Sequence, residues 1–316
     1  MLSGLILHLQ RLSTEDGPGL RTSVFFKGCP LRCEWCHNPE SLSPKPQVQW
    51  IETRCIGCGT CLETCRNGGL SKTEEGIVRD RTRCLGCGTC AEACPANAME
   101  LLGTRVSVDE LLAEVLKDRV YFEQSGGGVT ASGGEPAVQA EFVAEFLRRL
   151  REAGIRTALD TCGVCPPGSL ERLLPHTDLV LFDLKEIEAG KHREFTGQSN
   201  RKILENLLLV RDAIAARGRD VALWIRTPLI PGATATRENV SGLGAFIARH
   251  VDGIVERWEL CAFNNLCRDK YRRLGMEWRF TDTPLMTQES LHEWEECAKE
   301  SGVRRDIVIV TGTPRA

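Results

Sequence analysis

The stretch Gly28-Cys29-Pro30-Leu31-Arg32-Cys33-Glu34-Trp35-Cys36-His37-Asn38-Pro39-Glu40 places three cysteines within eight residues, at C-x3-C-x2-C spacing. This spacing is tight enough for one loop to wrap one inorganic cluster. A cubane iron–sulfur cluster needs four ligands, one for each iron, so three cysteines leave one iron without a protein thiolate. In metal sites an open position is where substrate chemistry takes place. The indole of Trp35 offers an aromatic face for a planar ligand group.

The loop has two other interpretations, a zinc knuckle and a disulfide loop. Zinc usually takes four ligands, and His37 is available to complete such a set. The spacing, with an aromatic residue before the third cysteine, resembles the signature of the radical S-adenosylmethionine (SAM) enzymes. The resemblance implies that the open iron binds the amino and carboxylate groups of SAM, and that one electron cleaves SAM to methionine and a 5′-deoxyadenosyl radical. It makes Cys29, Cys33 and Cys36 the cluster ligands, with Trp35, Cys36 and His37 beside the cofactor.

Composition limits the classes of protein and of partner. The chain has 316 residues, of which 42% are hydrophobic, enough for one large core or for a core plus a small module. Its net charge of −3 gives no indication of nucleic acid or an anionic membrane as partner. The apolar run at residues 5–11 is too short and too polar to span a bilayer, and it lacks the features of a signal peptide. We therefore expect a cytoplasmic protein.

Sixteen cysteines in a cytoplasmic protein favour metal over disulfides. Residues 48–102 contain an internal repeat with two C-x2-C-x2-C-x3-C runs: Cys55, Cys58, Cys61, Cys65 and Cys84, Cys87, Cys90, Cys94. The repeat resembles a bacterial two-cluster ferredoxin, in which the fourth cysteine of each run ligates the other run's cluster. One cluster would then take Cys55, Cys58, Cys61 and Cys94, and the other Cys84, Cys87, Cys90 and Cys65. A pair of zinc sites is the alternative.

From residue 103 onward, apolar strands alternate with amphipathic helices. Continuous apolar runs such as Leu179-Val180-Leu181-Phe182 indicate strands buried on both faces, hence a parallel sheet. We expect strands at 2–13, 22–28, 128–133, 156–162, 179–185, 221–229, 254–262 and 305–310, and helices at 107–118, 137–153, 168–174, 200–217, 236–250 and 287–301. The pattern predicts an α/β fold, a full or partial (β/α) barrel of residues 1–47 and 103–316 with residues 48–102 as an inserted ferredoxin-like domain.

Two predicted strands end in segments that suit a charged ligand. Glycines at Gly133-Gly134-Glu135 let a ligand meet bare backbone, and the carbonyls or Glu135 can accept from an ammonium group. In radical SAM enzymes a Gly-Gly-Glu at this place receives the SAM amino group. Asp183-Leu184-Lys185 closes another strand, with Asp183 and Lys185 on one face. Lys185 could pair with the SAM carboxylate, and an internal Asp183–Lys185 ion pair is the alternative.

Three more positions follow from the resemblance. Asp160 and Asp183 would complete a small monovalent cation site, as they would in pyruvate formate-lyase activating enzyme. Arg226 meets the ribose or carboxylate of SAM, or is structural. Asn264 stands where the related pattern usually has histidine, so we expect it to contact the ribose or adenine through hydrogen bonds alone.

The segment Asp16-Gly17-Pro18-Gly19-Leu20-Arg21 is strong turn chemistry. It is similar to a segment of the activating enzymes of glycyl radical enzymes, and the resemblance covers nearly the whole chain. It implies hydrogen abstraction from a backbone glycine of a partner glycyl radical enzyme, with three 4Fe-4S clusters, SAM, and flavodoxin or ferredoxin as electron donor. The cluster and SAM carry the chemistry, so no catalytic side chain is expected.

Two other functions stay open at this point. One is a radical SAM enzyme that acts on a small molecule. The other is an electron-transfer ferredoxin on a barrel scaffold, which leaves the Gly-Gly-Glu and Asp-Leu-Lys segments unexplained. Five cysteines have no assigned role: Cys162, Cys165, Cys261, Cys267 and Cys297. The Cys162-x2-Cys165 pair suits either a redox pair or structural thiols, and the lack of a thioredoxin context favours the second.

Overall fold

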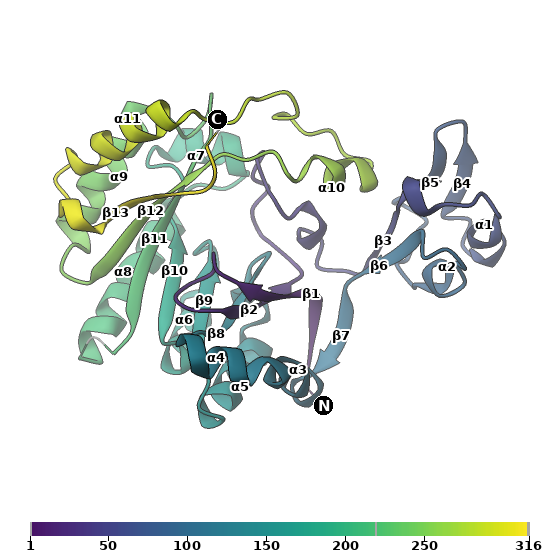
Figure 1. Cartoon of the computed structure of the whole chain (residues 1–316), viewed down its shortest axis with the longest axis horizontal. Helices are drawn as coiled ribbons and strands as arrows, with labels where there is room; N and C mark the ends of the chain where they lie inside the picture. The colour runs from purple at the N-terminus through teal and green to yellow at the C-terminus, as the bar shows by residue number, and fades with distance from the viewer. Residues whose placement is uncertain (1, 219, 315–316) are drawn as a thin grey trace.

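The computed structural model describes residues 2–218 and 220–314. Within them, nine strands form one sheet in the order β13-β12-β11-β10-β9-β8-β2-β1-β7 (Figure 1). Seven of these strands run parallel: β2 (Arg21–Phe26), β8 (Gly128–Gly133), β9 (Arg156–Thr161), β10 (Leu179–Asp183), β11 (Ala222–Leu229), β12 (Val255–Ala262) and β13 (Val308–Thr311). β1 (Ser3–Ser13) and β7 (Thr104–Ser107) extend one edge in antiparallel pairing. In the described part of the chain β7 and β13 are the two sheet edges, which agrees with the predicted partial α/β barrel.

The predicted helices are present, with ends shifted by up to three residues, and pack on the outside of the sheet (Figure 1). They are α3 (Val108–Val115), α5 (Ala140–Glu152), α6 (Pro167–Leu173), α8 (Arg201–Ala216), α9 (Arg237–His250) and α11 (Gln288–Lys299). α3 begins with a capping box, in which Ser107 and Glu110 satisfy each other's backbone N–H groups. The short helices α4 (Arg119–Ser125), α7 (Ala189–Thr196) and α10 (Arg268–Arg273) were not predicted.

Six single turns of 3-10 helix complete the connections: η1 (Pro39–Ser41), η2 (Glu52–Arg54), η3 (Leu116–Asp118), η4 (Pro136–Gln139), η5 (Leu174–His176) and η6 (Arg305–Ile307). η6 explains why β13 begins three residues later than the predicted strand 305–310. It occupies the first residues of the predicted strand 305–310, so pairing with β12 begins only at Val308. Among the described residues, no helix combines the length and apolar character needed to cross a membrane.

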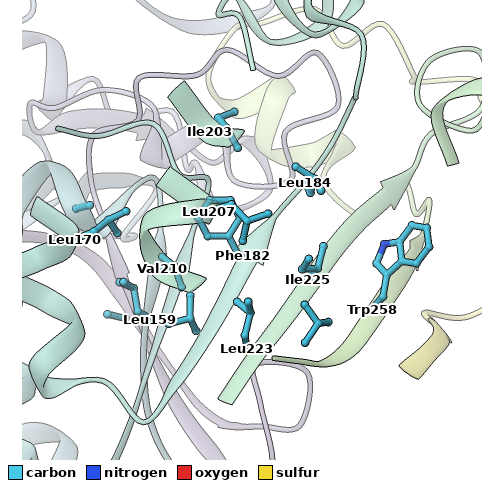
Figure 2. Close-up of a cluster of buried hydrophobic side chains, with 14 of the residues drawn as sticks. Leu159, Leu170, Phe182, Leu184, Ile203, Leu207, Val210, Leu223, Ile225 and Trp258 are labelled. Carbon is cyan, nitrogen blue, oxygen red and sulfur yellow. The ribbon is translucent and has the colours of Figure 1, made fainter. Parts of the chain in front are cut away.

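The core lies between the outer face of the sheet and the helices that cover it (Figure 2). Leu159, Phe182 and Ile225 come from three neighbouring strands, and Leu207 and Val210 of α8 pack against this layer; all five are inaccessible to solvent. Burial of each such side chain contributes about 1.5–3 kcal/mol. This packing fixes the strand ends, and therefore the loops that follow them, at one edge of the sheet.

Residues between β3 (Gln47–Trp50) and β6 (Met99–Leu102) form a separate lobe, closed by antiparallel pairing of these two strands. The lobe contains α1 (Thr60–Thr64), β4 (Leu70–Thr73), β5 (Gly76–Arg79) and α2 (Thr89–Glu92), and it projects from one side of the sheet domain (Figure 1). α1 and α2 each follow a glycine in the left-handed conformation, Gly59 and Gly88, as the sequence repeat requires. Its small apolar cluster is distinct from the main core.

Candidate active site

One cavity of about 290 Å³ lies where the parallel strands reach their carboxyl ends. Twelve predicted residues line it: Cys29, Cys33, Trp35, Cys36, His37, Gly133, Gly134, Asp160, Asp183, Lys185, Arg226 and Asn264. They come from segments that end or follow β2, β8, β9, β10, β11 and β12. Parallel strands bring these segments together because all their carboxyl ends meet at one edge. Two predicted contacts, Glu135 and Leu184, are buried outside the lining of this cavity.

The three-cysteine loop is held from two sides. On one side, the backbone N–H groups of Arg32 and Glu34 donate to Thr196 O (2.7 Å) and Phe195 O (3.0 Å) at the end of α7. On the other side, the Tyr271 hydroxyl of α10 donates to Cys36 O at 2.9 Å. These contacts fix the loop without using a cysteine side chain. The thiols are therefore left to face the cavity.

The three thiols line one cavity together and have the donor chemistry of an iron–sulfur cluster site. Burial raises the pKa of Cys33 to about 12, and it also raises the pKa of Cys36. Cys33 and Cys36 therefore ionise only at a cost, which the positive charge of iron offsets when a cluster binds. The chemistry of the donor set fits an iron–sulfur cluster with one open position.

Glu135 does not face the cavity. Its carboxylate is fully buried and accepts hydrogen bonds from Ala137 N (2.9 Å), Cys162 N (2.7 Å) and the Thr161 hydroxyl (2.9 Å). Burial raises its pKa. The side chain therefore braces the turn after β9, and it is the backbone of Gly133 and Gly134 that lines the cavity.

The two glycines have a second reason to be glycine. Gly133 has a φ of +108°, and a Cβ there would lie 2.4 Å from Phe26 N. A Cβ on Gly134 would lie 2.4 Å from Gly28 O, where the cysteine loop begins. These distances are too short for any side chain. Close packing of β8 against β2 and the loop thus requires glycine, independently of a ligand.

Asp183 and Lys185 form an ion pair inside the cavity. Burial acts to lower the pKa of Lys185, but the charge of Asp183 and of nearby thiols outweighs it, so the pKa is raised. The internal ion pair considered as an alternative is thus present. It is compatible with ligand binding, because both side chains also line the cavity where a carboxylate and an ammonium group could exchange with them.

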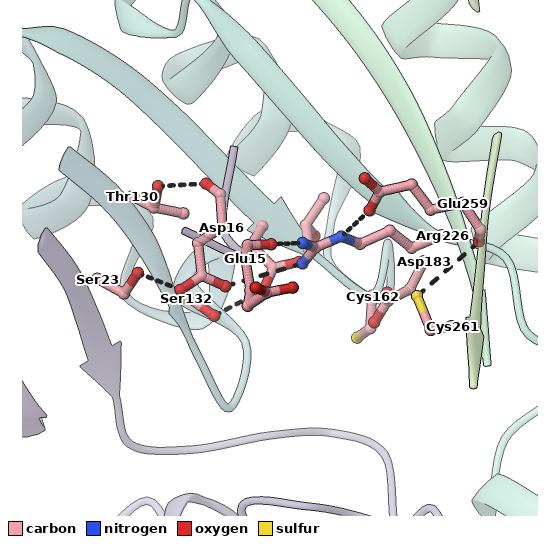
Figure 3. A network of polar contacts seen from close by, with 12 residues as sticks. Glu15, Asp16, Ser23, Thr130, Ser132, Cys162, Asp183, Arg226, Glu259 and Cys261 are labelled. Carbon is pink, nitrogen blue, oxygen red and sulfur yellow. Dashed lines mark hydrogen bonds and ion pairs between the residues drawn. The ribbon is translucent and has the colours of Figure 1, made fainter. Parts of the chain in front are cut away.

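Arg226 is the centre of a polar network across the barrel interior (Figure 3). Its guanidinium donates to Glu259 at 2.9 Å and to the backbone oxygen of Glu15, and it lies 3.8 Å from Asp160 and 4.0 Å from Asp16. Asp16 also accepts from the Ser13 and Ser23 hydroxyls, at 2.7 and 2.5 Å. The Asp-Gly-Pro-Gly segment is therefore tied into the barrel. Arg226 has a structural role whether or not it meets a ligand.

In the lobe of residues 48–102, the structure brings together both predicted cysteine sets. A cavity of about 240 Å³ is lined by Cys55, Cys58, Cys61 and Cys94. In the second set, burial and the neighbouring thiols Cys84, Cys65 and Cys87 raise the pKa of Cys90 to about 11. The fourth cysteine of each run thus lies with the other run, as the ferredoxin repeat implies.

The described residues contain no group of three His, Cys, Asp or Glu side chains that could hold a single metal ion. A zinc site needs its donors about 2.0–2.3 Å from one point. A cubane cluster instead binds each thiolate at a different iron, so its cysteines need not converge on one point.

Sequence reasoning missed Cys162, which lies in the cavity. It is 5% exposed, and the nearby Cys162 thiol lowers the pKa of Cys29. Its place directly after β9, at the edge where the parallel strands have their carboxyl ends, was the available signal. Cys165 instead lies against Asn206, whose amide donates to Cys165 O at 2.9 Å. Among the other unassigned cysteines, Cys261 also lines the cavity.

Comparison with known proteins gives three findings. Residues 15–204 match the family described as a 4Fe-4S single cluster domain. The (2S)-3-sulfopropanediol dehydratase activating enzyme of Klebsiella oxytoca is 38% identical, over 98% of this chain and 97% of that protein. The pyruvate formate-lyase 2-activating enzyme of Escherichia coli strain K12 is 38% identical, over 95% of this chain and 90% of that protein.

Among solved structures, Streptococcus suis SuiB bound to precursor peptide SuiA aligns with a TM-score of 0.52 at 10% identity, covering 90% of this chain and 46% of that one. At this identity the likeness concerns the fold alone. It supports the sheet architecture described above.

Proposed function

Since the chain belongs to the activating enzymes of glycyl radical enzymes, we propose that the cavity at the carboxyl ends of its strands holds SAM on a 4Fe-4S cluster bound by Cys29, Cys33 and Cys36. It is a radical SAM enzyme that abstracts hydrogen from a backbone glycine of a partner glycyl radical enzyme. The observation that carries the residue assignment is that three half-buried cysteines share one cavity with Asp160, Asp183 and Lys185. When bound, the cluster supplies the one electron that cleaves SAM.

The residues around the cavity would position SAM and exclude water. Lys185 would bind the carboxylate of SAM, and the carbonyls of Gly133 and Gly134 would accept from its amino group. Trp35, His37 and Asn264 would contact the nucleoside. Asp160 and Asp183 would hold a monovalent cation beside the carboxylate. Because Glu135 is engaged by protein donors, its proposed role is to fix this edge of the site.

The partner's glycine has to reach the cavity, so an extended peptide segment is the natural substrate. The two relatives named above are both activating enzymes, which favours this function over a small-molecule substrate. The identity of the partner enzyme is not specified by the residues described above. We propose only its class, a glycyl radical enzyme.

Residues 48–102 would form a ferredoxin-like domain with two further 4Fe-4S clusters on the two cysteine sets. Their proposed role is to pass electrons from flavodoxin or ferredoxin to the SAM cluster. Replacing Cys58 and Cys87 with Ala should abolish activation driven by reduced flavodoxin, while activation driven by dithionite persists. Equal activation by flavodoxin in the wild type and this variant would reject the relay. Chemistry that depends on free thiols and reduced clusters fits a reducing compartment, the cytoplasm.

The test of the cofactor assignment is the iron and acid-labile sulfide content of anaerobically prepared protein, with EPR of the reduced form before and after SAM. About twelve irons per chain, with one signal that shifts on SAM addition, is the expected result. About four irons with the same shift would leave the SAM site intact but reject the two clusters of residues 48–102. Bound zinc without iron would reject the entire assignment.

A further inference from the structure

The two cysteine runs of the inserted lobe are alike in sequence but lie in different surroundings. Gly57 and Gly86 are equivalent positions in the repeat, and both have a left-handed backbone, with φ of +72° and +65°. A Cβ added to Gly57 would meet no atom within 4 Å, whereas a Cβ added to Gly86 would lie 2.2 Å from Pro46 O. Gly57 is exposed and Gly86 is buried. At these equivalent positions the second run packs against the segment that leads out of the SAM-cluster loop, and the first run does not.

Two other observations indicate that the second cysteine run faces the sheet domain. The cavity around Cys55, Cys58 and Cys61 is lined only by residues of the lobe itself. By contrast, Ala91 of α2, which follows the second run, shares a surface cavity with His8 and Glu40 of the sheet domain. Glu40 ends the stretch that contains the three-cysteine loop. The second run is therefore on the side of the lobe that faces the sheet domain.

We infer that the lobe is held in one orientation that places the second cysteine run, 84–90, between the first run, 55–61, and the SAM-cluster loop. This inference rests on the proposed function, since it concerns the order of the cofactor sites. It goes beyond the proposed function because it gives the two cysteine runs different positions relative to the SAM-cluster loop. The second run is the inner site and the first run is the outer site.

α10 is the element that fixes this orientation. The guanidinium of Arg81, which lies between the two runs, donates to Leu274 O (2.6 Å) and Gly275 O (3.1 Å) just beyond α10. On the other side of the helix, Lys270 donates to His37 O at 3.0 Å, and Tyr271 donates to Cys36 O. One short helix thus contacts both the lobe and the SAM-cluster loop. Arg81 and Lys270 are positioning residues in this arrangement.

The first test compares Gly86→Ala with Gly57→Ala. Both substitutions place a side chain at a similar positive φ, so their backbone strain is alike, and only the first disturbs the packing on Pro46. We expect Gly86→Ala to speed hydrogen exchange of residues 44–50 by roughly fivefold, through easier local opening, with Gly57→Ala near the wild type. Equal effects of the two substitutions would overturn the inference. Hydrogen exchange is measured on the polypeptide backbone, so its result can be interpreted whether or not the cofactor assignment is correct.

If Gly86→Ala does not fold, hydrogen exchange in Arg81→Ala is compared with that in Arg83→Ala as its control. Both side chains are exposed, but Arg83 pairs only with Asp80, at 3.5 Å, within the lobe. We expect faster exchange at residues 44–50 in Arg81→Ala only. Wild-type exchange in Arg81→Ala would overturn the role of α10.

The order of the sites is tested by EPR relaxation of the reduced SAM cluster. Loss of the inner cluster in Cys87→Ala should slow this relaxation more than loss of the outer cluster in Cys58→Ala, since magnetic coupling falls steeply with distance. The reverse ranking would overturn the inference. An iron content of about four per chain in the wild type would instead reject the proposed clusters of the lobe, which separates the two failures.

Discussion

Replacing Glu135 with Ala separates two roles that a Gly-Gly-Glu segment can have. In the structure the carboxylate accepts from Ala137 N, Cys162 N and the Thr161 hydroxyl, and all four side chains are buried. Without it, three donors lose their acceptor at a cost of about 1–3 kcal/mol each. We expect a loss of about 3–9 kcal/mol in the free energy of unfolding. With an m-value of about 3 kcal/mol per M, the urea midpoint should fall by roughly 1–3 M.

The measurement is anaerobic urea unfolding followed by tryptophan fluorescence, together with the SAM dissociation constant from equilibrium titration. Glu141→Ala is the matched control, because Glu141 is exposed in the first turn of α5. A direct contact between Glu135 and the SAM amino group would give a different result, with the urea midpoint unchanged and SAM bound far more weakly. That outcome would refute the bracing role.

Three further variants test the network and the loop. Arg226→Gln removes the cation that faces Asp160 and Glu259; Glu259 keeps its 3.0 Å ion pair with Arg257, but Asp160 is left without this cation, which should cost about 3–5 kcal/mol, seen as a lower urea midpoint. Tyr271→Phe removes the 2.9 Å hydrogen bond to Cys36 O, worth about 1 kcal/mol, so iron loss to a chelator should be roughly fivefold faster than in the wild type. For Asp160, burial raises the pKa to about 7, above an unfolded value of about 4, so the folded state binds the proton more tightly and stability falls as pH rises between these values. In Asp160→Asn this fall should be smaller in urea titrations at a series of pH values, with a remainder of the same sign from the raised pKa of Glu135, and an undiminished fall would contradict the role of Asp160.

The barrel could be predicted from sequence because its strands and long helices carry local signals. Leu179–Phe182 is apolar throughout since both faces of β10 are buried, and α5 shows an apolar stripe because only one face packs. α10 has no such pattern: its sequence, Arg268 to Arg273, is almost entirely charged. What holds it are hydrogen bonds to Cys36 and His37, more than 230 positions away in the chain. No local pattern records such contacts.

Within the candidate site, the sequence located the residues at the strand ends but not the direction of every side chain. Alternation along β10 placed Asp183 and Lys185 together, and the structure pairs them. The same rule fails after β8, because Gly133 takes a positive φ that interrupts the alternation. Glu135 then points toward the turn at Cys162 and away from the cavity. A conformation open only to glycine thus decides which group of the segment can meet a ligand.

The charges around the cavity indicate the kind of ligand that it suits. Arg226 lies near Asp16, Asp160 and Glu259, and Arg257 also pairs with Glu259. Burial is the main cause of the raised pKa of Asp160, and the charges of Asp183 and Asp16 add to it against the lowering effect of Arg226. A ligand or ion that brings positive charge to this edge lowers this pKa. SAM carries an ammonium and a sulfonium group, and a bound monovalent cation would act in the same direction. Burial of Asp160 near Asp16 and Asp183 therefore favours a ligand with a positively charged group at this edge, because such a group would lower the cost of keeping these carboxylates ionised.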